Sequence, residues 1–162
     1  MRKELFTSIK QQLSRLRVNA SGEYTMAEDS SCCADLMPAV RHIDLWNRNV
    51  EFIEDEEAWP RPAVFIEIEP VCWTGIVPGL EYRAEARVRL HIVTDWAGTA
   101  DGPFGAVSML ELPDHIHDAL GGLCGDTFRE LTLEESHTNH NHGDIVENIE
   151  VYGFTAIKRA GR

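Results

Sequence analysis

The chain has 162 residues, 43% of them hydrophobic and 26% charged, which allows one folded domain with a sizeable core and excludes disorder throughout. Its 27 acidic and 15 basic side chains give a formal net charge of −12, which argues against nucleic-acid binding through a basic surface. No apolar run approaches the roughly 20 residues of a membrane span, and the N-terminus lacks the apolar core of a signal peptide, so we expect an intracellular protein without membrane contact.

The first third of the chain predicts a helix, a loop and a strand. Residues 2–17 form the helix, because leucine and isoleucine recur there at spacings of four, four and three. Residues 19–35 are polar and small and predict a flexible loop, which includes the adjacent Cys32 and Cys33. Residues 40–46 predict a strand, with Ile43 and Leu45 at a period of two.

The middle of the chain predicts the main strands of a sheet. Residues 63–68 are the most hydrophobic short run and predict a central strand, and residues 71–80 predict a loop. Residues 81–92 alternate without a break between apolar and charged side chains. This alternation predicts one buried and one charged face, as in an antiparallel sheet that is covered on a single side.

The last third adds helices and two closing strands. Residues 104–112 have helical spacing, and Pro113 is expected to begin a separate helix, since proline is tolerated at the first helical position. Strands are expected from residue 128 to about 133 and over 145–157. The chain is therefore predicted to be a single α+β domain, residues 1–162, with a mostly antiparallel sheet and an N-terminal helix and a second main helix packed on one face.

A histidine-rich segment between the two closing strands offers a candidate metal site. Its donor side chains are His137, His140, His142 and Asp144, and neutral imidazole suits zinc, nickel or copper. The spacing is that of a connecting loop, however, and closing such a loop on a metal costs ordering entropy. A plain polar loop is favoured, with a metal-binding module or metal-dependent enzyme as the alternative.

Other reactive residues form no recognisable catalytic pattern. His115 and His117 stand two residues apart in a predicted helix and point in different directions, so a solvated face is favoured, with Asp114 near the free amides of the helix start. The cysteines, including Cys72 and Cys124, are expected to be reduced and partly buried. Motifs for a serine nucleophile or a phosphate loop are missing from the sequence. We expect no enzymatic activity and no cofactor.

Tryptophans and arginines supply candidate interface residues. The four tryptophans fall at expected strand ends or in loops, where they either cover the core or anchor a partner chain. The arginines of the alternating strand are usually just solvated, but they can dock against complementary patches of a neighbouring copy. The candidates are Trp46, Trp59, Trp73, Trp96, Arg83, Arg87 and Arg89.

The order of these elements and several short phrases resemble a known family. The phrases are V-x-H-I-D-L-W-N at residues 40–47, P-A-V-F-I-E-I at 62–68 and I-H-D-A-L-G-G-L at 116–123, followed by residues 135–152. They resemble the tail-completion proteins of long-tailed bacteriophages and prophages, which comprise tail terminators and tail-to-head joining proteins. The resemblance covers nearly the whole chain, and it implies an antiparallel sheet with two main helices on one side.

The resemblance also implies a structural role. Members of this family form homohexameric rings on the end of the tail tube and meet the head connector, so the implied partners are further copies of the chain, tail-tube proteins and connector proteins. The implied location is the host cytoplasm during assembly and then the virion tail. Besides the metal-dependent alternative, a small adaptor domain that uses its tryptophan-bearing loops remains open.

Overall fold

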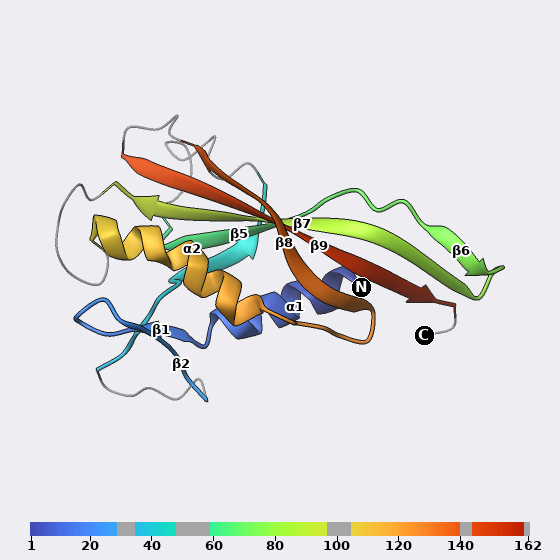
Figure 1. The fold of residues 1–162 in the computed structure, drawn as a ribbon, viewed down its shortest axis with the longest axis horizontal. Helices are drawn as coiled ribbons and strands as arrows, with labels where there is room; N and C mark the ends of the chain where they lie inside the picture. Colours follow the sequence, from blue (N-terminus) through green and yellow to red (C-terminus); the bar gives the residue numbers. More distant parts are fainter. Residues whose placement is uncertain (29–34, 48–58, 97–104, 140–143, 161–162) are drawn as a thin grey trace.

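The computed structural model describes residues 1–28, 35–47, 59–96, 105–139 and 144–160, with the side chains of residues 106–109 left out (Figure 1). Its elements are α1 (Arg2–Leu13), β1 (Leu16–Val18), β2 (Tyr24–Met26), β3 (Met37–Pro38), β4 (His42–Leu45), β5 (Ala63–Ile68), β6 (Thr74–Val77), β7 (Glu81–Asp95), α2 (Ala106–Leu120), β8 (Phe128–Asn139) and β9 (Ile145–Arg159).

Six of the strands form one large sheet. Their order is β4-β5-β7-β9-β8, and β6 pairs with the beginning of β7. The β4–β5 pair is parallel and the other pairs are antiparallel. All fifteen residues of β7 are in register with β9, from Glu81 opposite Arg159 to Asp95 opposite Ile145. The predicted α+β class with a mostly antiparallel sheet is confirmed, and β2-β1-β3 add a small second sheet.

The main core lies between the large sheet and the two helices, which cover the same face (Figure 1). Helix α1 contributes a stripe of fully buried side chains at a spacing of four, as its sequence predicts. Alternate residues of β7, from Ala84 to Ile92, face these helices. Among the described side chains of the two helices, the buried ones are Leu5, Ile9, Leu13, Leu112, Ile116 and Leu120.

The helix boundaries differ from the predicted ones in two places. Helix α1 ends at Leu13, and Leu16 belongs to β1, where pairing with β2 and β3 satisfies its backbone. Helix α2 runs without interruption from Ala106 to Leu120 with Pro113 inside it, so the expected separate helix was wrong. Leu112, Ile116 and Leu120 form one fully buried stripe, and this packing outweighs the break that proline favours.

Replacing Pro113 with alanine should stabilise the protein. The substitution restores a backbone N–H to the helix interior, where proline is about 3 kcal/mol less favourable than alanine. The more flexible unfolded chain offsets about 1 kcal/mol of this gain. We expect the free energy of unfolding in urea to rise by about 2 kcal/mol, with Asp114→Ala on the exposed neighbouring residue as the control. A less stable Pro113→Ala protein would mean that the proline ring itself contributes essential packing.

Three segments predicted as loops contain strand. Tyr24–Met26, within the expected flexible region of residues 19–35, forms β2, while residues 29–34 with Cys32 and Cys33 lie outside the described part. Residues 74–77 form β6 within the expected loop at 71–80. Strand β8 continues to Asn139, six residues beyond its predicted end, because it pairs with β9 over this length. Backbone pairing with the neighbouring strand decided each case.

The second face of the sheet is partly covered, which corrects the prediction of a single covered side. At the end of the sheet near Asp95, a smaller apolar cluster comprises Ala63, Phe65, Val93 and Ile145, with Trp46 and Trp59 packed against it. At the opposite end, β6 and the adjoining ends of β7 and β9 project beyond the helices (Figure 1). We call this projection, residues 74–85 and 155–159, the arm. None of the described helices is long and apolar enough to cross a membrane.

Candidate functional site

The sheet face opposite the helices carries a row of ion pairs. Because Val88 and Leu90 face the helices, the intervening arginines of β7 lie on the other side. The Arg87 Nε atom lies 2.8 Å from an oxygen of Glu134, and an Arg89 nitrogen lies 2.7 Å from an oxygen of Glu69. Arg83 likewise pairs with Glu81 at 3.2 Å. The three arginines predicted as interface candidates are therefore neutralised within their own chain, and they are about half exposed.

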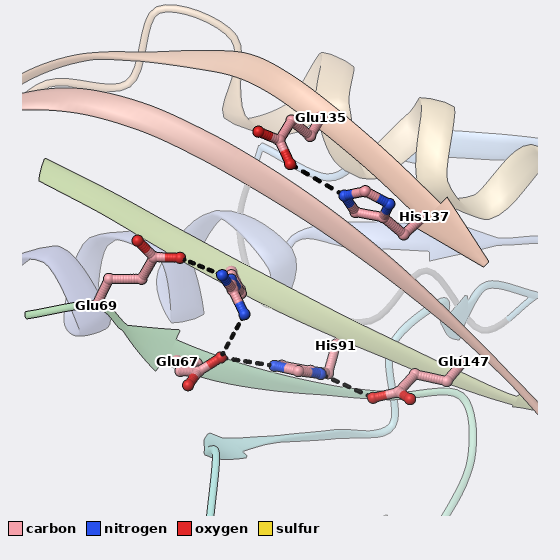
Figure 2. A network of polar contacts seen from close by, with 7 residues as sticks. Glu67, Glu69, His91, Glu135, His137 and Glu147 are labelled. Carbon is pink, nitrogen blue, oxygen red and sulfur yellow. Dashed lines mark hydrogen bonds and ion pairs between the residues drawn. The ribbon is translucent and has the colours of Figure 1, made fainter. Parts of the chain in front are cut away.

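A buried histidine continues this row. The His91 side chain is 5% exposed, its Nδ1 atom lies 2.7 Å from Oε1 of Glu147, and its Nε2 atom lies 3.2 Å from Oε2 of Glu67 (Figure 2). The Glu147 side chain is also 5% exposed, and its other oxygen accepts a hydrogen bond from the Asn139 amide at 2.9 Å. Strands β5, β7, β8 and β9 thus share one polar network.

Two of the four tryptophans cover this end of the sheet. The Trp46 ring stacks on the His91 ring with a centroid separation of 3.8 Å and an interplanar angle of 2°. Trp59 meets Phe65 edge-on at 4.9 Å. These positions match the core-covering alternative for Trp46 and Trp59. Trp73 packs against the main core at the base of the arm, and Trp96 is 63% exposed.

The candidate metal ligands do not converge in the described part of the chain. His137 lies on β8 and its Nε2 atom is 3.0 Å from a carboxylate oxygen of Glu135 (Figure 2). This hydrogen bond, together with nearby Arg87, lowers the pKa of Glu135. Asp144 stands just before β9, and His140 and His142 lie outside the described residues. Over the described ranges, no group of three or more His, Cys, Asp or Glu residues is arranged to hold a metal ion.

The other sequence candidates occupy different surroundings from those predicted. His115 stacks on Tyr24 at 4.3 Å, and His117 stacks on Tyr152 at 6.1 Å, so the solvated-face prediction was wrong for both histidines. Burial and the nearby carboxylate of Glu111 raise the pKa of Tyr24 to about 12. Asp114 lies in the middle of α2, because the helix begins at residue 106. Cys72 and Cys124 are free, as expected, but exposed.

Glu4 of α1 ties the helix to the loop before β8. Its carboxylate accepts hydrogen bonds from the backbone N–H of Asp126 at 2.6 Å and of Thr127 at 3.1 Å, and one from the Thr127 hydroxyl. Burial alone would raise the pKa of Glu4, but these hydrogen bonds to the charged form outweigh it, so the pKa lies below its ordinary value of 4.5. The loop lies so close to Glu4 that a side chain on Gly125 would collide with Glu4 and Phe128.

We expect Glu4→Gln to lower the free energy of unfolding by about 1 kcal/mol at pH 7, since glutamine keeps one acceptor oxygen and places an NH2 group where the second carboxylate oxygen accepted a hydrogen bond. A carboxylate whose pKa is depressed by folding stabilises the protein above its unfolded pKa. The deficit of the variant should therefore be constant above about pH 5.5 and shrink as the pH falls through 4.5 and below. Urea titrations at several pH values measure this, with exposed Glu111→Gln as the control. A deficit independent of pH would contradict the assignment.

A hollow of about 770 Å³ opens beneath the arm, beside the N-terminal end of α1. Apolar side chains of Val71, Trp73 and Ile157 contribute to its wall. Its charged residues are mainly basic, namely Arg2, Arg129, Lys158 and Arg159, against Glu4 and Asp126. Glu4 is already engaged by the loop, and Arg159 pairs with Glu81 at 3.4 Å. Arg2, Arg129 and Lys158 still outnumber Asp126, so the hollow is a basic region in a chain whose net charge is −12.

Two groups of residues had no place among the sequence-based candidates. The first is the network of His91, Glu67 and Glu147. The sequence offered one signal for it: on the charged side of the alternating strand, His91 is followed by the apolar Val93, which indicates that this side becomes covered there. The second is the apolar end of the arm, where Ile76, Val77 and Leu80 are exposed. Residues 71–80 were predicted to form a loop, in which apolar side chains are expected to pack locally. The sequence therefore gave no sign that these side chains are exposed at the end of a projecting strand pair.

Comparison with known proteins places this arrangement among solved folds. No family model and no curated protein matches the sequence. Among solved structures, the chain is similar to one in the virion of a native gene transfer agent particle, with a TM-score of 0.54, 13% identity and 95% of each chain covered. The chain shares its fold with a virion chain. At this identity the likeness concerns the fold, and it extends over nearly the entire length of both proteins.

Proposed function

We propose that this protein is a structural component of a phage-like particle, and that it acts at the end of the tail tube as a tail terminator or tail-to-head joining protein. The observation that carries the proposal is the shared fold, which covers 95% of this chain and 95% of the chain in the gene transfer agent virion. The resemblance of its sequence phrases to tail-completion proteins points to the same class of role. The role is structural, and we propose no catalytic activity for it.

The described surfaces fit such a role. The charged face of the sheet is internally paired and carries a rigid polar network, so its arginines are committed to holding neighbouring strands together. The arm instead presents apolar side chains that its own chain leaves uncovered. We propose that copies of the chain close into a ring through heterologous contacts, in which one surface meets a different surface of the next copy.

Deletion of the gene in the host that carries it tests the proposal. Particles should be purified with and without the gene, analysed by mass spectrometry and imaged by electron microscopy. We expect the protein in wild-type particles, and tails of abnormal length or tails without heads in the deletion strain, with recovery when the gene is supplied again. Normal particles that lack the protein would contradict the proposal.

A further inference from the structure

The end of the arm is the most concentrated apolar surface in the described part of the chain. The described part of the chain exposes seven large hydrophobic side chains, and three of them fall within five residues at the end of the arm: Ile76 at 52%, Val77 at 43% and Leu80 at 61%. Single exposed apolar residues are ordinary, but a cluster on a projecting element marks a contact surface. We call these three residues the arm tip.

The edge of the sheet at the arm tip is also unprotected by charge. Residues 74–80 contain no charged side chain. The opposite edge strand, β8, carries Glu134 and Glu135, which pair with Arg87 and are typical of edges that resist association. In β6 the register shifts between Gly75 and Val77, which displaces Ile76 from regular pairing. The arm tip therefore combines apolar side chains, a free edge and a local irregularity.

The hollow beneath the arm provides a complementary surface on the same molecule. At about 770 Å³ it has room for several aliphatic side chains, and its wall includes Val71 and Trp73. The arm tip does not line this hollow. Because β6 is paired with β7 up to Val77, the tip is held away from the hollow of its own chain. A tip that fills such a hollow therefore belongs to another molecule.

We propose that the arm tip of one copy inserts into the hollow of a second copy, in a head-to-tail contact. Charge favours a second copy as the occupant. The basic rim of the hollow attracts a chain whose net charge is −12, and the uncharged tip brings no cation that would oppose this attraction. Two different surfaces on one chain generate a ring or an open chain of copies. The inference rests on the proposed function, for which it names the surfaces that join the copies.

Sedimentation and light scattering on purified protein test the contact. We expect wild-type mass to increase with concentration, and Leu80→Lys in the tip and Val71→Lys in the hollow each to weaken association at least tenfold. A 1:1 mixture of the two variants should form pairs and nothing larger, because one intact tip and one intact hollow remain. Lys158→Glu, on an exposed rim residue, replaces Val71→Lys if the latter proves poorly folded. Leu110→Lys, on the exposed side of α2, is the matched control and should associate normally.

Several outcomes would overturn the inference. These are a wild-type chain that stays monomeric at about 1 mM, tip and hollow variants that associate normally, or a mixture that does not pair. If the mixture of tip and hollow variants does not pair, the partner of the tip is a different protein. Failure of the proposed function is a separate result: a chain that self-associates in this way but is missing from particles contradicts only the virion role. A chain found in particles whose Leu80→Lys variant associates normally contradicts only the contact.

Discussion

Replacing His91 with alanine should lower the free energy of unfolding by about 3 kcal/mol. The substitution removes the hydrogen-bond partner of the buried Glu147 carboxylate at 2.7 Å and of Glu67 at 3.2 Å. It also removes the ring on which Trp46 stacks. A buried carboxylate that loses its main partner costs about 3–5 kcal/mol when the pair is charged and about 1–3 kcal/mol when it is a hydrogen bond. Urea unfolding followed by tryptophan fluorescence measures the stability, and the difference between the native spectra of the variant and the wild type includes the change around Trp46.

His137→Ala is the matched control for this prediction. His137 also lies on the face away from the helices and also contacts a glutamate, but its side chain is 58% exposed. Its loss should change stability by less than about 0.5 kcal/mol. Combining His91→Ala with Glu147→Gln should cost less than the sum of the two single effects, because the second substitution removes the unpaired charge. Equal effects of His91→Ala and His137→Ala would show that the buried network contributes little.

Phe128→Ala should destabilise the protein by about 4 kcal/mol, the effect of deleting a fully buried aromatic ring. Phe128 begins β8, meets Phe154 edge-on at 6.3 Å, and lies under the loop that Glu4 holds. Because Gly125 and Glu4 close over this ring, the surrounding structure has little freedom to collapse into the cavity. Denaturant unfolding at pH 7 provides the measurement.

Phe6→Ala makes the same chemical change at a position that is only partly buried, on α1. We expect it to cost less than half as much, because part of its ring already contacts water in the folded state. Similar losses for Phe6→Ala and Phe128→Ala would indicate that the loop around Phe128 rearranges to fill the cavity. The predicted closure by Glu4 and Gly125 would then be wrong.

The virion role and the head-to-tail contact are tested by separate measurements. The virion role is tested in particles, and the contact between copies is tested in purified protein. The predicted interface arginines Arg83, Arg87 and Arg89 have partners within the chain, so a contact that recruits them must first replace those partners. The arm tip has no such competition among the described residues, because its three side chains are exposed.

The sequence by itself determined the elements whose pattern is local and regular. The unbroken alternation of residues 81–92 predicted β7, and the leucine and isoleucine spacing of residues 2–13 predicted α1. Together with the predicted strand at residues 145–157, they led to the α+β class. These predictions succeeded because a side chain's direction in a regular helix or strand follows from backbone geometry alone, and one buried face suffices to reveal the period.

Only the tertiary structure decided the features that depend on distant partners. Helix α2 continues through Pro113 because its buried stripe packs on the sheet. His91 is buried because Trp46, just after β4, and Glu147, on β9, cover it. Residues 74–77 form a strand because β7 offers them a pairing edge. The contacts of α2 and His91 join residues separated by tens of positions, and β6 depends on the β7 edge that the large sheet holds in place. The free energy of such contacts exceeds the local preferences that a sequence pattern records.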